Sequence, residues 1–325
     1  MIARHRIAGL RWLWLCTSLT IAACGDTERD GVSGVVAEAS ASGGLVVASN
    51  YPLYFFAVRA TQDIDAAPEI VLPDFDGDPT EWIPSEEQIQ LLQLADLVIL
   101  NGAGAEPWLE LVTLDRRRLS ETAAALADRL IPLHDSVLHQ HGPEGDHSQQ
   151  GSAFTFWLDP QLAIAQAQVV TEALALLTPA HATRYRQNMA VLEQELMELD
   201  RRLADVFTNW NDRPVLFSHP VYQYLQRRYG INGASLHWEP DARPALSGWA
   251  DLRQRLVSHP ATIMIWEQAP LPDTAARLAS QGIVSVPFHT IGNRPTQGDF
   301  MTAMLENAQR LETVFRTDDQ RTDNP

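Results

Sequence analysis

The chain has 325 residues, a length that suits two lobes of common domain size, and a formal net charge of −17 from 41 acidic and 24 basic side chains. Such an acidic surface is a poor partner for nucleic acid, and the lack of lysine excludes Schiff-base chemistry and phosphate-binding loops that depend on a lysine. Cys16 and Cys24 are the only cysteines, so no disulfide framework or thiolate metal site can form within the chain, and any metal must be bound by histidines and carboxylates.

The N-terminus carries the signals of export and lipid attachment. Basic residues followed by a short apolar run predict a signal peptide over residues 1–23. Residues 21–24 (IAAC) match a bacterial lipobox, which is cut before a cysteine that then receives a lipid. We therefore expect lipidation of Cys24, a flexible tether over residues 24–44, and a periplasmic or extracytoplasmic protein anchored to the cell membrane. The alternative is a short buried helix or an uncleaved anchor.

An N-terminal α/β lobe is expected over residues 45–178. Apolar runs at 45–49 and 97–100 predict strands, and Ser85 between them is a suitable N-cap for a short helix. Strands that alternate with helices predict a parallel sheet. Within this lobe, the polar stretch 134–151 is rich in histidine, glycine and proline, and it predicts a mobile loop.

A long helix is expected to connect this lobe to a second one. Apolar residues recur at steps of four and three from Tyr185 to Val206, which indicates one buried stripe on a helix within residues 179–212. A helix of that length would be on the order of 40 Å long. Residues 213–315 then form a C-terminal α/β lobe, followed by a polar tail at 316–325.

Three strand-like runs of the second lobe end in side chains that can bind metal. The residues that close these runs are His219, Glu267 and His289. The carboxyl ends of parallel strands meet at one crevice, so two imidazoles and a carboxylate suggest a metal site there. A single histidine at such a place more often caps its strand or bonds a carbonyl, so the metal prediction depends on the coincidence of all three residues. The segment 237–239 (HWE) lies in a loop after Gly233 and could be a rim contact or plain surface, and we favour plain surface.

Four sequence motifs carry a resemblance to a known family. They are residues 48–53 (ASNYPL), 95–109 (ADLVILNGAGAEPWL), 157–160 (WLDP) and 217–225 (FSHPVYQYL). With them the chain resembles, from about residue 45 to 311, the zinc- and manganese-binding solute-binding proteins of bacterial metal ABC transporters, cluster A-I type. A histidine-rich loop before the WLDP motif resembles zinc-specific members.

The resemblance implies a fold and a function. The fold is two α/β lobes, each a parallel sheet flanked by helices, joined by one long spine helix. The function is capture of a divalent transition metal, above all Zn²⁺, in the cleft between the lobes for an ABC permease, by a monomer that is no enzyme. The family places one ligand in each of four loops, and the corresponding residues here are Thr80, Thr155, His219 and His289.

Two family histidines are thus threonines, and a neutral hydroxyl is a weak zinc ligand. Three interpretations follow: the loop completes the site, two imidazoles plus water form an open site, or the cleft has lost tight metal binding and takes another ligand or an envelope protein. A metallohydrolase using His219, His289 and Glu267 is a rival from another class. The auxiliary candidates for metal binding are His139, His141, His147 and Glu267.

Overall fold

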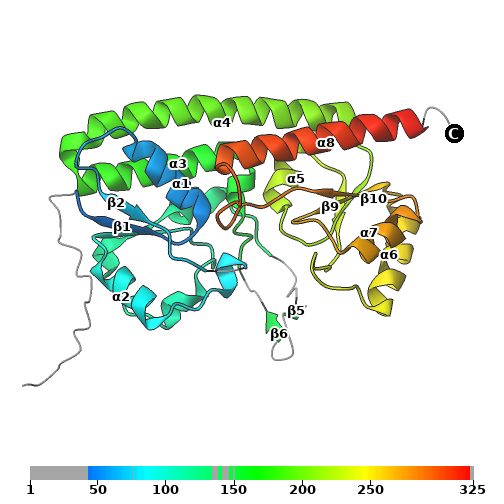
Figure 1. Cartoon of the computed structure of the whole chain (residues 1–325), viewed down its shortest axis with the longest axis horizontal. Coiled ribbons are helices and arrows are strands. Elements are labelled where there is room, and N and C mark those ends of the chain that lie inside the picture. The colour runs from blue at the N-terminus through cyan, green and yellow to red at the C-terminus, as the bar shows by residue number, and fades with distance from the viewer. Residues whose placement is uncertain (1–42, 76, 134–137, 141–145, 149–150, 323–325) are drawn as a thin grey trace, which may run out of the picture. The chain divides into compact units, whose positions relative to one another are not determined.

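The computed structural model of the chain describes residues 43–75, 77–133, 138–140, 146–148 and 151–322 (Figure 1). All of these belong to one compact unit, residues 41–325. The expected signal peptide and lipidated Cys24 lie outside the described residues. Within the described part, no helix is both long and apolar enough to cross a membrane.

The first sheet contains four parallel strands in the order β2-β1-β3-β4. Its strands are β1 (Leu45–Ala48), β2 (Glu69–Val71), β3 (Leu97–Leu100) and β4 (Leu119–Glu121). In the register of the central pair, Val46 lies opposite Leu97 and Ala48 lies opposite Ile99. β3 is buried along its whole length and β1 over three of its four residues, as expected for central strands of a sheet covered on both faces.

Helices of the first lobe begin where the sequence supplies a cap. Helix α1 (Tyr51–Thr61) is capped by the side chain of Asn50, and α3 (Pro160–Leu177) by that of Asp159. The helix expected from Ser85 is confirmed as α2 (Glu86–Leu94), where Ser85 and Gln88 form a capping box. Short 3-10 helices complete the lobe: η1 (Pro79–Glu81), η2 (Pro107–Glu110), η3 (Arg116–Arg118), η4 (Thr122–Arg129) and η5 (Phe156–Leu158).

Two short strands lie within the stretch that the sequence predicts to be a mobile loop. β5 (Leu138–Gln140) and β6 (Asp146–Ser148) pair antiparallel, and the backbone of His139 lies opposite that of His147. The rest of the stretch up to residue 150 lies outside the described residues.

The second sheet repeats the strand order of the first. Its parallel strands are β7 (Val215–Phe217), β8 (Gly233–Ser235), β9 (Ile263–Trp266) and β10 (Val284–Pro287), in the order β10-β9-β7-β8. Its helices are α5 (Gln223–Tyr229), α6 (Leu246–Ser258) and α7 (Pro272–Ala279). In each sheet the first and third strands along the chain are therefore the central pair.

Two long helices pack against each other across the lobes (Figure 1). After the short η6 (Pro179–His181), α4 (Ala182–Trp210) contacts α1 and α3 of the first lobe and α5 of the second. Its buried stripe runs from Tyr185 to Trp210, as the periodicity predicts. The other long helix, α8 (Phe300–Thr322), continues through most of the segment expected to be a polar tail.

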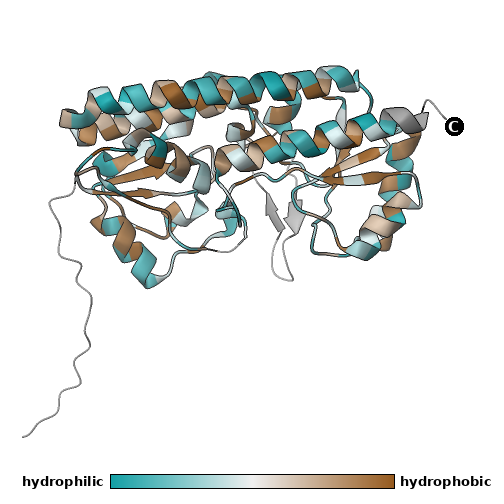
Figure 2. Cartoon of the chain, turned by 45° about the horizontal axis from the view of Figure 1, so that its top comes forward, coloured by the Kyte–Doolittle hydropathy of each residue, from teal (hydrophilic) through white to brown (hydrophobic). Residues whose placement is uncertain are grey.

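One buried apolar cluster includes residues of both sheets and of α4. At the start of α8, the centroid of the Phe300 ring lies 5.5 Å from the ring centroid of Phe55 and 5.6 Å from that of Phe56, both in α1. Figure 2 shows strands of both sheets as largely hydrophobic, whereas hydrophobic and hydrophilic residues alternate along α4. The expected fold class, two parallel sheets flanked by helices and joined by a spine helix, is confirmed.

Candidate metal centre

The candidate residues of the second lobe lie just beyond the carboxyl ends of adjacent strands. His219 follows β7, Glu267 follows β9 and His289 follows β10. β7 and β9 are the central pair from which the sheet is built outward in both directions, and the crevice at such a switch point is the usual ligand site of an open α/β sheet.

His219 is held by a carboxylate. Its side chain is buried, and its Nδ1 lies 3.0 Å from Oε1 of Glu267. A carboxylate only accepts, so Nδ1 carries the proton and donates. The other ring nitrogen, Nε2, lies 3.8 Å from Oε1 of Glu239 and is the atom that can bind a metal.

His289 is held by the backbone of the same glutamate. Its Nδ1 donates to the carbonyl oxygen of Glu267 at 2.9 Å, which again leaves Nε2 as the metal-binding nitrogen. Asn307 of α8 fixes the backbone of His289: the amide of His289 donates to Oδ1 at 2.9 Å, and Nδ2 donates to the carbonyl oxygen of His289 at 2.8 Å. Glu267 therefore sets the tautomer and orientation of both imidazoles.

The pKa values of the two imidazoles are shifted in opposite directions. Burial lowers the pKa of His219, but hydrogen bonding to Glu267 and the nearby charges of Glu239 and Asp78 outweigh burial and raise the pKa above its ordinary value. For His289, burial and the charge of Arg310 lower the pKa. His289 is thus the more readily available as a neutral ligand, while a metal at His219 must displace a more tightly held proton.

At both positions where the resemblance leads us to expect a histidine of the first lobe, the threonine hydroxyl donates to a protein oxygen. Thr80 Oγ1 lies 2.8 Å from Oδ1 of Asp78, which also accepts from the amide of Thr80. Thr155, which is buried, donates through Oγ1 to the carbonyl oxygen of Val221 at 2.5 Å. Because Val221 belongs to the second lobe, the Thr155 bond ties the two lobes together.

The segment after His289 docks on the first lobe. Trp157 Nε1 donates to the carbonyl oxygen of Thr290 at 2.6 Å. The amide of Tyr51 donates to the carbonyl oxygen of Gly292 at 3.0 Å. Gly292 lies so close to Pro79 that an added Cβ would be 3.3 Å from Pro79 Cγ. The strand end that carries His289 is therefore fixed against both lobes.

The structure brings His219, His289 and Glu267 together, but with Glu267 bonded to the imidazoles rather than beside them as a further ligand. Among the described residues, no group of three or more histidine, cysteine, aspartate or glutamate side chains stands ready to hold a metal. The side chains of His139 and His147, and all of His141, lie outside what the structure describes.

Sequence reasoning missed Glu239. The preferred interpretation of residues 237–239 as plain surface is wrong for Trp238, which is only 4% exposed, and Glu239 approaches His219, whereas His237 is exposed. The signal in the sequence is the alternation of apolar Leu236 and Trp238 with polar His237 and Glu239, which is the pattern of an extended chain with one buried face.

Two α/β lobes with parallel sheets, joined by one long helix and with candidate ligands at strand ends, are the architecture of solute-binding proteins whose lobes a rigid helix connects. The family described as "Zinc-uptake complex component A periplasmic", ZnuA, matches residues 46–314, so the chain belongs to that family. Members of this family are solute-binding proteins of metal uptake and not enzymes.

The chain is similar to two zinc-related proteins of other bacteria. It is 23% identical over 286 residues to the zinc-binding lipoprotein AdcA of Streptococcus pneumoniae, covering 85% of this chain and 56% of AdcA. It is 23% identical over 269 residues to the high-affinity zinc uptake system protein ZnuA of Bacillus subtilis, covering 81% and 82%. The chain thus spans about half the length of the AdcA relative.

Solved structures share the fold. The metal-dependent lipoprotein YcdH of Bacillus subtilis has a TM-score of 0.69 at 19% identity and covers 82% of this chain and 97% of its own. The Zn(II)-bound ZnuA-like domain of Streptococcus pneumoniae AdcA has a TM-score of 0.69 at 18% identity, with 83% and 98% covered.

Proposed function

We propose that this protein captures Zn²⁺ between its lobes and delivers it to the permease of an ABC importer, held at the membrane by a lipid on Cys24. Family membership and the zinc-binding relatives support metal uptake. The lipobox and the AdcA relative, itself named a lipoprotein, support anchoring.

The observation that carries the proposal is the pair of hydrogen bonds that Glu267 accepts, one from each histidine. With Nδ1 of His219 at 3.0 Å and Nδ1 of His289 at 2.9 Å from oxygens of Glu267, each ring directs Nε2 away from Glu267. Imidazole nitrogen suits zinc, and a carboxylate or carbonyl behind a zinc-binding imidazole raises its basicity and fixes its direction. Neither arrangement is required if the histidines only cap their strands.

The first lobe contributes little to this site. Thr80 and Thr155 donate their hydroxyl protons to protein oxygens and are weak ligands for zinc. Binding would then rest mainly on His219 and His289. The prediction that His139, His141 or His147 completes the site from the histidine-rich stretch stays open, and deletion of residues 135–150 tests it.

Titration of the metal-stripped mature chain with zinc tests the proposal. One tight equivalent is expected, and changing His219 and His289 together to alanine should abolish it. Competition at equal free metal should favour zinc over manganese, which prefers oxygen ligands. Undiminished zinc affinity in the double variant would remove the proposed site. Cell fractionation of a Cys24→Ala variant tests the anchor, and release from the membrane is expected.

A second candidate function is a family member that has lost tight metal binding and holds another ligand or an envelope protein. The hydrogen bond of Thr155 to Val221 favours it, because a lobe-to-lobe bond occupies the position of a family ligand. The same titration decides, since this candidate requires that zinc, copper and nickel all fail to bind tightly.

A further inference from the structure

The chain beyond β8 runs beside His219. The amide of Leu236 donates to the carbonyl oxygen of Phe217, and that of Trp238 to the carbonyl oxygen of Ser218, both at 2.8 Å. This pairing continues the β7–β8 ladder past the end of β8, so side chains alternate between two faces. Leu236 and Trp238 each pack in the core of the second lobe with 4% exposure.

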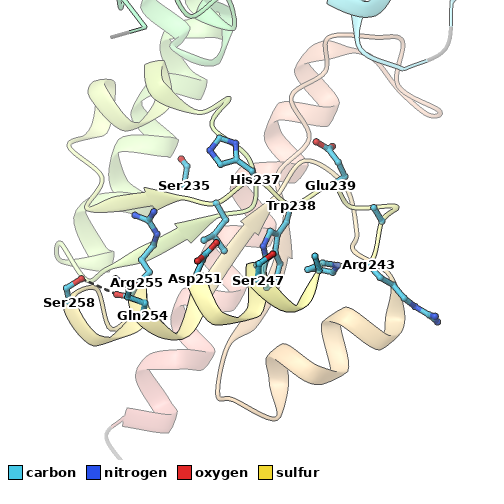
Figure 3. Close-up of a pocket in the computed structure, with 15 residues that line it drawn as sticks. Ser235, His237, Trp238, Glu239, Arg243, Ser247, Asp251, Gln254, Arg255 and Ser258 are labelled. Carbon is cyan, nitrogen blue, oxygen red and sulfur yellow. Dashed lines mark hydrogen bonds between the residues drawn. The ribbon is translucent and has the colours of Figure 1, made fainter. Parts of the chain in front are cut away.

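Alternation places His237 and Glu239 on the other face. Figure 3 shows Trp238 directed toward α6, while His237 and Glu239 lie on the opposite side of the segment. The His237 ring centroid is 6.2 Å from that of His219, and Oε1 of Glu239 is 3.8 Å from Nε2 of His219. The segment that follows β8 therefore brings a carboxylate to the metal-binding nitrogen of His219.

The distance between Nε2 of His219 and Oε1 of Glu239 is close to that between two ligand atoms bound to one metal ion. Two ligand atoms bound to tetrahedral zinc at about 2.0–2.2 Å are about 3.3 Å apart. The observed 3.8 Å differs from this by a shift that a small side-chain rotation supplies. The Glu239 side chain is 40% exposed. It also borders a cavity of about 660 Å³, lined in addition by His237, Asp251 and Arg255, that is open to solvent.

Two other carboxylates raise the pKa of His219, those of Glu267 and Asp78, and both are engaged in hydrogen bonds to other groups than Nε2. Glu267 is bonded to the opposite ring nitrogen, Nδ1. Asp78 of the first lobe accepts hydrogen bonds from both the amide and the hydroxyl of Thr80. Glu239 differs from both in that its Oε1 approaches Nε2 of His219, at 3.8 Å.

We propose that Glu239 is a metal ligand in this chain, binding the captured ion through its carboxylate together with His219 and His289. The inference rests on the proposed function and deepens it. A carboxylate of the second lobe would take a ligand position that the first lobe leaves to threonine. The ion would then be bound by one lobe, with an N₂O donor set that suits zinc and leaves a position for water.

Zinc affinity of four mature, metal-stripped chains tests the proposal: the parent, Glu239→Gln, Glu239→His and Asp241→Asn. Asp241 is exposed and lies two residues along the same loop, so its variant controls for loss of a nearby charge. Competition with a chelator should show at least about a tenfold loss of affinity for Glu239→Gln and none for Asp241→Asn. Glu239→His should retain affinity within about threefold, because imidazole replaces one ligand by another.

Each contrary outcome has a separate meaning. Parental affinity in Glu239→Gln overturns the proposal, and if His219→Ala still loses binding, the proposed function stands without it. Equal weakening in the Gln and His variants also overturns it, because Glu239 would then act only by charge. Failure of the parent itself to bind zinc refutes the proposed function instead. Thermal unfolding of all variants, expected to match the parent, shows that each is folded.

Discussion

Glu267 holds His219 by its side chain, with Oε1 3.0 Å from Nδ1, while its backbone carbonyl holds the other candidate histidine at 2.9 Å. One residue thus orients imidazoles from two different strand ends. Because Glu267 closes β9, which lies between β7 and β10, the strand order of the sheet makes this arrangement possible.

Changing Glu267 to glutamine should weaken zinc binding by about ten- to a hundredfold, the usual effect of losing a carboxylate behind a zinc-binding imidazole. The backbone bond to His289 persists in this variant, so binding should weaken without being abolished. The same change should lower the pKa of His219, which the carboxylate now raises. NMR titration of the imidazole measures the second effect. Glu110→Gln, at an exposed site in η2, is the control, and equal zinc affinity in the two variants would contradict the assigned role.

Restoring an imidazole in the first lobe should strengthen binding. Thr80 is partly exposed, and its amide and hydroxyl both donate to Asp78 within its own loop, so replacement removes none of the hydrogen bonds between the lobes described above. Thr80→His is expected to raise zinc affinity at least about tenfold by adding a nitrogen ligand. The matched control is Thr113→His, at an exposed position of the same lobe. Isothermal titration of both variants measures the gain, and equal affinities would show that Thr80 does not face the site.

The sequence could predict the central strands of both sheets and the edge strand β10, but not the three-residue edge strands β2, β4 and β8. β3 and β9 are buried throughout and read as continuous apolar runs. β4 (Leu-Ser-Glu) and β8 (Gly-Ala-Ser) are three-residue edge strands without a fully buried residue, so no apolar run marks them. The shared strand order of the two sheets was also invisible, because only hydrogen-bond pairing reveals it.

The residues of the candidate site likewise fall into those that the sequence could predict and those that it could not. His219 and His289 could be placed because each follows a recognisable apolar strand. Glu239 could not be placed, because it follows the unrecognised β8 and reaches His219 only through the pairing of residues 236 and 238 with Phe217, at the end of β7, and Ser218. That Thr155 bonds to Val221 of the other lobe depends likewise on the packing of the two lobes, which no local pattern encodes.

A buried carboxylate, Asp200, fixes the spine helix to both lobes, and neutralising it should destabilise the protein. Asp200 of α4 accepts from Arg228 Nε at 2.9 Å, from the hydroxyl of Tyr229 at 3.0 Å and from Nε2 of Gln161 at 2.8 Å. Burial alone would raise the pKa of Asp200, but these hydrogen bonds lower it. Asp200→Asn should lower the free energy of unfolding by about 2 kcal/mol, less than for a fully buried pair because Arg228 is partly exposed.

Urea denaturation measures the Asp200 effect, and an exposed pair supplies its control. Arg186 and Glu172 make the same bidentate contact, but more than half of each side chain is exposed. Glu172→Gln should therefore change the free energy of unfolding by no more than about 0.5 kcal/mol. Equal effects of the two substitutions would show that burial of Asp200 adds nothing to its ion pair.

A buried carboxylate just before η2 should make stability depend on pH. Glu106 is 7% exposed, and burial raises its pKa to about 7, although Ser49 Oγ and the amides of Asn101 and Gly102 donate to it and lower the pKa. Its pKa in the unfolded chain is lower, so between the two values the folded protein binds more protons. Stability should therefore fall as pH rises from about 4.5 to about 7 and level off above, by at most about 3 kcal/mol.

The comparison of the parent with Glu106→Gln isolates this contribution, because the other titrating groups are common to both chains. Glutamine stays neutral, so its stability relative to the parent should rise from about pH 5 to about pH 7 and then remain constant. Thermal or urea unfolding at a series of pH values measures the difference. Glu110→Gln, which removes an exposed carboxylate four residues away, should show no such trend. A difference between Glu106→Gln and the parent that is the same at every pH would mean that the three donors keep Glu106 ionised despite its burial.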